Sequence, residues 1–191
     1  METAEPLRKT RAIMLSDIMG YSRMMGEDES LGLRLLEEHN SLCVPLIKEN
    51  RGQVLKFIGD AILSSFESAS DAVHCAITVQ RALARRNASR PDQEKIVIRI
   101  GIHIGDVVFK DGDVFGDGVN IAARIEPLAE PGGIAVSQTV YDMLKARPEI
   151  QTISLGPKEL KNIKDAVNIY KVLVEAQEGR AGGALPAGNA A

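Results

Sequence analysis

The order of apolar and polar residues along the chain follows two periods, one typical of helices and one typical of strands. Residues 28–50 and 69–86 place apolar side chains on one face and charged side chains opposite, which predicts two amphipathic helices. A similar helical pattern covers residues 116–128, and a short helix is expected from Ser137 to about Lys145. Continuous apolar runs and apolar–polar alternation predict strands at 12–15, 54–58, 61–66, 95–109, 134–136, 153–163 and 167–174.

Local signals mark where several of these elements should begin or end. Gly59 and Asp60 separate two strands and predict a hairpin turn, and Ser68 is a candidate N-cap for the helix that follows. Pro45 should kink the first long helix or force a boundary near it. Because hairpins lie between helices in place of strict β–α–β alternation, the predicted fold class is α+β.

The length and the composition fit one folded domain. The chain has 191 residues, of which 45% are hydrophobic, and this is enough to build a single core. We expect a flexible N-terminal segment at 1–9 and a folded domain at 10–175. The Gly/Ala/Pro-rich residues 176–191 predict a disordered tail or a linker.

Charge and apolar content exclude several classes of partner. The chain has 23 Lys+Arg against 26 Asp+Glu, a net charge of −3, and only 4% aromatic residues, so no nucleic-acid partner is expected. No apolar run reaches the roughly 18 residues that a membrane span needs, and the start lacks the apolar region of a secretory signal. Cys43 and Cys75 lie in apolar helical patterns, which predicts reduced core thiols and a cytoplasmic location.

Two aspartates are candidates for binding a cation. Asp17 follows the apolar run 12–15, and Asp60 lies at the tip of the predicted hairpin. Carboxylates at strand ends suit a hard divalent cation such as Mg²⁺, which prefers oxygen ligands. Taken alone, each aspartate is better explained as an ordinary turn residue, so a cation site depends on both acting together.

Three further polar residues stand out against apolar surroundings. Asn120 and Arg124 are spaced i, i+4 on one helical face, and a guanidinium can bind phosphate through two parallel N–H groups. Taken alone, Arg124 is better explained by a solvated surface ion pair with Glu126 or Asp117. Lys56 interrupts an apolar strand, so its ammonium either reaches solvent or contacts a polar group in a pocket.

Three motifs follow one another along the chain: residues 16–22 (SDIMGYS), 56–61 (KFIGDA) and 113–126 (DVFGDGVNIAARIE). In this order and at these intervals they resemble the catalytic domain of the class III nucleotidyl cyclases, above all the bacterial adenylate cyclases. The resemblance covers about residues 10–175, and residues 155–172 are similar to the last two strands of the family. It implies a fold related to ferredoxin-like domains, with a mixed, mainly antiparallel sheet and flanking helices.

The resemblance implies a role for each candidate residue. Asp17 and Asp60 match the aspartates that bind two divalent cations, Mg²⁺ or Mn²⁺, and the backbone carbonyl of Ile18 would join them. The other implied roles are base recognition by Lys56 and Asp113, ribose orientation by Asn120, stabilisation of the pentacoordinate phosphorus by Arg124, and binding of the terminal phosphates by Lys161 or Lys164.

The implied activity is that of an adenylate cyclase, a lyase that converts ATP into 3′,5′-cyclic AMP and pyrophosphate. In this reaction the ribose 3′-hydroxyl attacks the α-phosphorus. The resemblance also implies a head-to-tail homodimer in which each site takes residues from both protomers. One interpretation makes the chain the catalytic part of a larger sensor protein that carries a regulatory domain and acts in cyclic AMP signalling.

Two alternatives to an adenylate cyclase stay open. A guanylate cyclase is disfavoured because guanine recognition would require Glu at the position of Lys56. A cyclase-like regulatory module that binds nucleotide without turnover is disfavoured because the two aspartates and the Asn120/Arg124 pair are all present.

Overall fold

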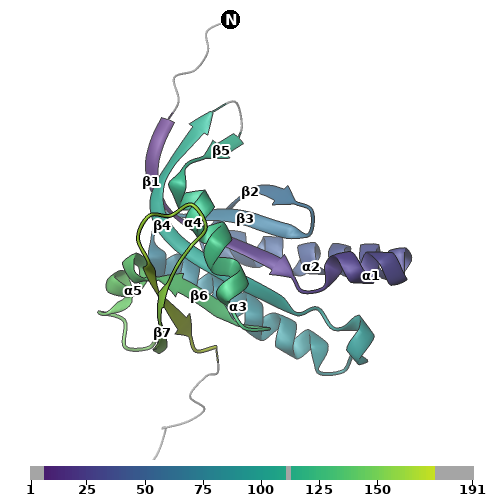
Figure 1. Cartoon of the computed structure of the whole chain (residues 1–191). Helices are drawn as coiled ribbons and strands as arrows, with labels where there is room; N and C mark the ends of the chain where they lie inside the picture. Colours follow the sequence, from purple (N-terminus) through teal and green to yellow (C-terminus); the bar gives the residue numbers. More distant parts are fainter. Residues whose placement is uncertain (1–6, 111–112, 175–191) are drawn as a thin grey trace, which may run out of the picture.

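The computed structural model describes residues 7–110 and 113–174 and shows a mixed β-sheet with helices on both faces (Figure 1). The strand order is β2-β3-β1-β4-β6-β8-β7, and β5 pairs with β4 outside this path. The described neighbours pair antiparallel, except for the parallel pair β4 and β6. The predicted α+β fold with a mainly antiparallel sheet is therefore confirmed. The strands are β1 (Leu7–Ile18), β2 (Gln53–Ile58), β3 (Ala61–Phe66), β4 (Ile98–Lys110), β5 (Asp113–Phe115), β6 (Ile134–Ser137), β7 (Thr152–Lys158) and β8 (Val167–Val172).

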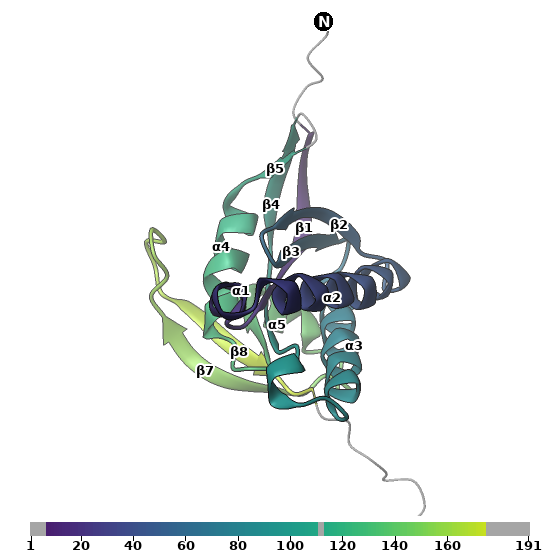
Figure 2. The ribbon, with the colours of Figure 1, turned by 90° about the vertical axis from the view of Figure 1, so that its right-hand side faces the viewer.

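The helices divide between the two faces of the sheet. The long helices α2 and α3 lie on one face, and α4 lies on the other (Figure 2). The two faces therefore have separate apolar clusters, the larger one beneath α2 and α3 and a smaller one beneath α4. The α-helices are α1 (Tyr21–Glu27), α2 (Glu29–Glu49), α3 (Ala69–Asn87), α4 (Asp117–Ile125) and α5 (Gln138–Leu144), and the 3-10 turns are η1 (Asp92–Glu94) and η2 (Glu126–Leu128).

The central strand β1 supplies side chains to both clusters. Ala12 and Met14 pack in the larger cluster beneath α2 and α3, whereas Ile13 and Leu15 pack in the smaller cluster beneath α4. Successive side chains of a strand point to opposite faces. The same alternation places Asp17, at the end of β1, on the α4 side of the sheet.

Several predicted boundaries agree with the structure. The hairpin of β2 and β3 turns at Gly59 and Asp60, as its sequence indicates. The Ser68 side chain accepts a hydrogen bond from the backbone N–H of Asp71 at 3.0 Å, so the predicted N-cap of α3 is confirmed.

Other predictions about single elements were wrong. β1 begins at Leu7, so residues 7–9 belong to a strand and not to the flexible segment expected at 1–9, whose residues 1–6 lie outside the described part. Helix α2 has no boundary at Pro45 and continues to Glu49, because Cys43 and Ile47 are buried on either side of the proline and hold both parts of the helix against the core, while a kink at Pro45 stays a prediction. The tail expected at 176–191 also lies outside the described residues.

The strand predicted at 153–163 and the helix that follows Ser137 also differ from their predictions. The strand expected at 153–163 ends at Lys158, so Lys161 lies in the loop between β7 and β8. The Ser137 side chain does not cap α5, because it forms a hydrogen bond with His103 Nδ1 at 2.8 Å. The short helix α1 was not predicted from the sequence.

Strand β4 carries glycine where α4 and η2 approach the sheet most closely. A Cβ atom on Gly101 would lie 2.3 Å from the backbone nitrogen of Glu126, which is closer than atoms can approach. A Cβ atom on Gly105 would lie 3.2 Å from Cα of Gly118 in α4. These two glycines therefore allow α4 and the following turn to lie directly on β4.

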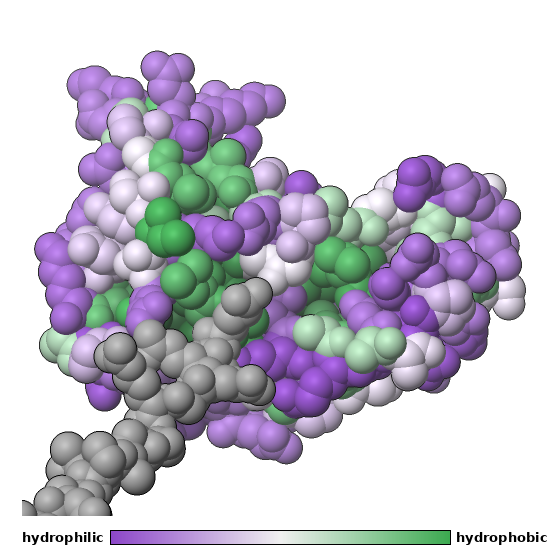
Figure 3. Space-filling model, turned by 90° about the horizontal axis from the view of Figure 1, so that it is seen from below, coloured by the Kyte–Doolittle hydropathy of each residue, from purple (hydrophilic) through white to green (hydrophobic). Residues whose placement is uncertain are grey.

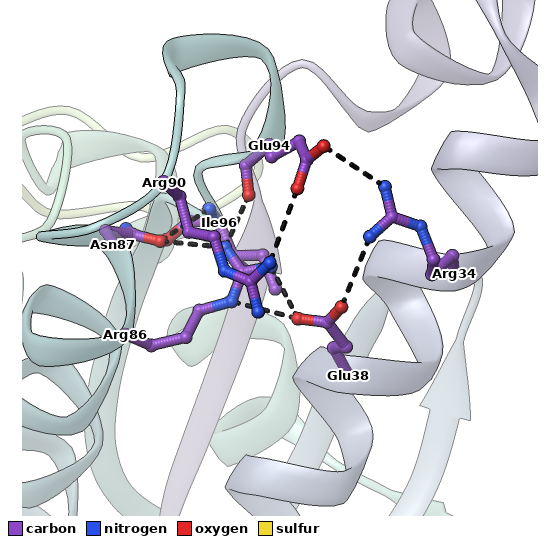
Figure 4. Close-up of polar contacts among 7 residues, drawn as sticks. All are labelled: Arg34, Glu38, Arg86, Asn87, Arg90, Glu94 and Ile96. Carbon is purple, nitrogen blue, oxygen red and sulfur yellow. Dashed lines mark hydrogen bonds and ion pairs between the residues drawn. The ribbon is translucent and has the colours of Figure 1, made fainter.

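A network of ion pairs joins α2, α3 and the η1 turn (Figure 4). Arg86 of α3 donates to Glu38 of α2 at 3.0 and 2.5 Å, and it also donates to the backbone carbonyl of Glu94. Arg34 lies 3.6 Å from Glu38 and 3.5 Å from Glu94. The hydrogen bond from Arg86 lowers the pKa of Glu38. Because the Arg86 side chain is only 12% exposed, this contact is less screened by solvent than an ordinary surface pair.

The surface of the molecule is mostly polar. Figure 3 shows this for one face, where hydrophilic residues cover most of the rim and hydrophobic residues gather in a hollow between them. Within the described residues, no helix has both the length and the apolar content required to cross a bilayer.

Candidate active site

The end of β1 and the tip of the β2–β3 hairpin bring two aspartates together. Asp60 Oδ2 accepts a hydrogen bond from the backbone N–H of Ile18 at 2.9 Å. This bond fixes the hairpin tip against the last residues of β1. The carboxyl group of Asp17 lies close enough to that of Asp60 for the two to interact. The hairpin tip and the end of β1 thus bring the two aspartates into one oxygen-rich group.

The environment of this pair disfavours two negative charges at once. Burial, together with the neighbouring Asp60, raises the pKa of Asp17 to about 7. Two carboxyl groups in contact repel when both are ionised, and a divalent cation between them would remove that repulsion. The site therefore fits a hard cation with oxygen ligands. The described residues hold no cluster of three or more His, Cys, Asp or Glu side chains suited to a metal, so these two carboxylates would have to work with backbone or substrate oxygens.

Two charged residues that the sequence reasoning gave no role complete the surroundings of Asp17. Arg99 of β4 lies opposite Asp17 in the strand register, and its Nη2 is 3.7 Å from Asp17 Oδ2. Its Nε is 2.8 Å from Oε1 of Glu126. Glu126 was considered as a surface partner of Arg124, but it is 5% exposed and pairs with Arg99. The signal in the sequence was an arginine within the apolar strand 96–104.

A second polar pair joins β2 of the hairpin to Asp113 of β5. Lys56 Nζ donates to Asp113 Oδ1 at 2.6 Å, and Asp113 also accepts from the backbone N–H of Val114 at 2.7 Å. A β-bulge between Val54 and Lys56 interrupts the ladder of β2 just before the lysine, and bulges commonly redirect a side chain. The bond from Lys56 lowers the pKa of Asp113. The ammonium of Lys56 thus contacts a polar group and does not simply extend into solvent.

Helix α4 carries the next two candidates. Asn120 is exposed and Arg124 is partly exposed, one turn apart on α4. Among the described residues, their side chains form no hydrogen bond or ion pair with the aspartates or with Lys56. Within one chain the structure therefore does not bring all the candidates to one point.

The β7–β8 loop carries the remaining candidate. Leu160 is 6% exposed and packs in the same cluster as Ile125 at the end of α4, which fixes the loop beside that helix. The neighbouring Lys161 is exposed, and so is Lys164. Either lysine is free to point toward a ligand, and the choice between them stays a prediction.

The fold and these pairs agree with the comparison against known families. A family model described as the adenylate and guanylate cyclase catalytic domain matches residues 5–174. The chain belongs to this family. It is thus a cyclase domain by sequence and by fold.

Two of the similar proteins are named as adenylate cyclases. The domain is 42% identical over 164 residues to a protein of Rhizobium meliloti named "Putative adenylate cyclase 3", and 32% identical over 193 residues to an adenylate cyclase of Anabaena cylindrica. These matches cover 85% and 90% of this chain. They cover only 28% and 38% of the two relatives, so this chain spans about a third of their length.

Solved structures show the same fold. The crystal structure of an adenylate/guanylate cyclase/hydrolase from Silicibacter pomeroyi matches with a TM-score of 0.82 and 38% identity, over 88% of this cyclase domain and 99% of that chain. The adenylyl cyclase CyaB of P. aeruginosa matches with a TM-score of 0.78 and 24% identity, over 91% and 98% of the two chains. The second similarity is evidence for the fold alone.

Other titratable residues of the cyclase domain lie in the core. Cys43 and Cys75 are free and buried, and burial raises the pKa of each thiol to about 12. Thiols with such a pKa are poor nucleophiles at neutral pH, which agrees with the predicted role as core residues. Burial lowers the pKa of His103 to about 4, so its ring is neutral over the physiological range.

Proposed function

We propose that this cyclase domain is an adenylate cyclase that converts ATP into 3′,5′-cyclic AMP and pyrophosphate. The ribose 3′-oxygen forms a bond to the α-phosphorus, the bond from that phosphorus to the bridging oxygen breaks, and pyrophosphate leaves. Little covalent work falls to the protein in such a transfer, so positioning and charge stabilisation dominate.

The Lys56–Asp113 pair is the observation that carries the choice of ATP. Adenine offers a ring-nitrogen acceptor and an amino donor, and an ammonium beside a carboxylate is the complementary pair. The two side chains already lie 2.6 Å apart, and they are 36% and 41% exposed, so a base can reach both. Guanine presents an N1–H and a carbonyl oxygen, and it would meet Lys56 with a donor facing a donor.

The carboxylates of Asp17 and Asp60 would hold two divalent cations, Mg²⁺ or Mn²⁺, together with the carbonyl oxygen of Ile18. When bound, such cations supply the positive charge that neutralises the phosphates and lowers the pKa of an attacking hydroxyl. A chain of net charge −3 can therefore bind the negatively charged ATP, because the carboxylates would bind the cations and the cations would bind the phosphates.

The other proposed roles belong to side chains that are exposed or partly exposed and can therefore contact a ligand. Asn120 orients the ribose, and the Arg124 guanidinium stabilises the charge that develops on the phosphorus in the transition state. Lys161, or Lys164 in its place, binds the terminal phosphates. The exposure of all four side chains supports roles in which they contact substrate or a second protomer.

A head-to-tail homodimer would complete the site. The structure of one chain leaves Asn120 and Arg124 without contact to the aspartates, which supports a second copy as the source of the missing residues. Apolar side chains next to the Lys56–Asp113 pair also support an interface, because Phe57, Ile58 and Phe115 are 51%, 50% and 53% exposed. The cytoplasmic location and the regulatory domain remain predictions of the sequence.

A cyclase assay over a protein dilution series tests chemistry and assembly together. Purified chain is mixed with ATP or GTP, each with Mg²⁺ or Mn²⁺, and cyclic nucleotide is measured. We expect cyclic AMP as the main product and a turnover per chain that falls on dilution. Cyclic GMP as the main product, or no product at micromolar protein with either metal, would overturn the proposal.

A pair of arginine variants adds a control for folding. Arg124→Ala should cost on the order of 2–4 kcal/mol of transition-state stabilisation, the loss typical of one such donor. Arg85→Ala is the matched control, because Arg85 is an exposed residue of α3. Equal turnover in the two variants would remove Arg124 from the mechanism.

A further inference from the structure

Three carboxylates and one guanidinium meet where β1, β4 and η2 come together. The carboxyl groups are those of Asp17, Asp60 and Glu126, and the guanidinium is that of Arg99. Asp17 and Asp60 form the candidate cation site, whereas Glu126 lies beneath it with only 5% exposure. A carboxylate so deeply buried is costly unless a partner compensates its charge, so its presence needs an explanation.

The backbone sets the distances within this group. Arg99 is the direct cross-strand neighbour of Asp17 in the antiparallel pair of β1 and β4. Glu126 begins η2 at the end of α4, and Gly101 allows this turn to lie directly on β4. Arg99 and Gly101 are two residues apart and face the same side of β4, so the Glu126 carboxylate and the Arg99 guanidinium meet on that side.

The guanidinium is shared unequally between its two partners. Its Nε lies 2.8 Å from Glu126 Oε1, whereas its Nη2 lies 3.7 Å from Asp17 Oδ2. The closer pair is also the more buried one, since the Glu126 side chain is 7% exposed and the Asp17 side chain is 30% exposed. Both Arg99 Nε and Glu126 Oε1 are buried, and among the described residues neither makes a hydrogen bond of regular geometry, so they meet as a close ion pair.

We propose that Glu126 is a positioning residue that holds the Arg99 guanidinium and so keeps Asp17 available to a divalent cation. This inference rests on the proposed cation site of the cyclase. The negative charge of Glu126 compensates the positive charge of Arg99. The negative charges of Asp17 and Asp60 are then not neutralised by the arginine and can bind the cation. Without Glu126, the arginine would pair with Asp17, and it would then compete with the cation for the same oxygen.

The alternative is that Arg99 and Glu126 only stabilise the fold. Both ideas predict a less stable protein when Glu126 is changed, so stability alone does not separate them. They differ in the effect of removing both charges. A positioning role predicts that cation binding recovers when the arginine is removed as well, whereas a purely structural role predicts no recovery.

Direct binding of Mn²⁺, measured by electron paramagnetic resonance without nucleotide, tests the proposal. In Glu126→Gln we expect the Mn²⁺ dissociation constant to rise about tenfold, the order expected from one uncompensated unit charge beside a partly exposed site. In the double variant Arg99→Met/Glu126→Gln we expect it to return to within about threefold of the unchanged protein. Glu126→Asp keeps the charge on a shorter side chain and should lie between these values, and it serves as the single variant if Glu126→Gln does not fold.

Several outcomes would overturn the proposal. One is an unchanged Mn²⁺ affinity in every folded single variant, and another is a folded double variant that binds as weakly as the single one. Absence of Mn²⁺ binding by the unchanged protein would also do so. Circular dichroism at each step reports folding. The proposed function fails separately, because a protein that binds Mn²⁺ with this pattern but makes no cyclic AMP refutes the activity and leaves the positioning role supported.

Discussion

Replacing Asp17 by Asn should stabilise the cyclase domain while it removes cation binding. The folded protein raises the pKa of Asp17 from 3.8 to about 7, so the stabilising contribution of this carboxyl is present at low pH and is lost as pH rises toward 7. A shift of about three units, at about 1.4 kcal/mol per unit, makes the ionised group cost about 4 kcal/mol at pH 8. At pH 5 the cost is smaller, because the folded group is then protonated.

Asparagine removes the charge and keeps a polar side chain of the same shape. Part of the cost of burial remains for the amide, so we expect Asp17→Asn to raise the free energy of unfolding by about 2 kcal/mol at pH 8. The gain should be smaller at pH 5. Urea unfolding followed by circular dichroism, at one fixed protein concentration, measures both values.

Metal addition and a control variant sharpen this test. Mn²⁺ at pH 8 should stabilise the unchanged protein and have no comparable effect on Asp17→Asn. Asp165→Asn, in the exposed part of the β7–β8 loop, should change stability by less than about 0.5 kcal/mol. The reasoning is refuted if Asp17→Asn is less stable than the unchanged protein at pH 8, or if its gain does not depend on pH.

Three further variants test how the scaffold is held together. Glu38→Gln should lower the free energy of unfolding by about 1 kcal/mol at pH 7, because the pKa of Glu38 is lowered by Arg86, and urea titrations should show this loss shrinking as pH falls through the lowered pKa of Glu38. Because the pKa of His103 is lowered to about 4 in the folded protein, the free energy of unfolding should fall by about 3 kcal/mol as pH drops from 6.5 to 4. His103→Gln should make this fall smaller, and an unchanged dependence on pH would contradict the reasoning. Gly101→Ala should lower the melting temperature through a loss of about 3 kcal/mol or more, since its Cβ would overlap η2, whereas Gly26→Ala, with no neighbour within 4 Å, is the control that should be neutral.

Much of the fold could be predicted from the sequence, because the apolar periods are strong in the segments that pack on the sheet. The helix at 69–87 and the hairpin of β2 and β3 are examples, and each has clear signals at its ends. Pro45 was misleading, since a rule about local hydrogen bonding was outweighed by burial of the residues around it. The first half of β1 was missed because residues 7–11 are mostly polar and are held in the sheet by pairing with β4.

The candidate site was predicted unevenly for a physical reason. Asp17, Asp60 and Lys56 stood out because each interrupts or ends an apolar strand. Arg99 and Glu126 are charged residues whose meeting depends on strand register and on a close helix approach. Neither of these is visible in sequence spacing, so their pairing became apparent only in three dimensions.

Side chains alternate between the two faces of β1, so the face on which Asp17 lies depends on the number of residues that precede it in the strand. Asp17 and its neighbour Ile18 face opposite sides of the sheet, and Ile18 is buried in the larger core. Inserting or deleting one residue between Ala12 and Asp17 would exchange their places, with a carboxylate in the core and an isoleucine beside Arg99. The strand can therefore accept changes of side chain more easily than any change of length, and this family should keep a fixed count between its core residues and its first aspartate.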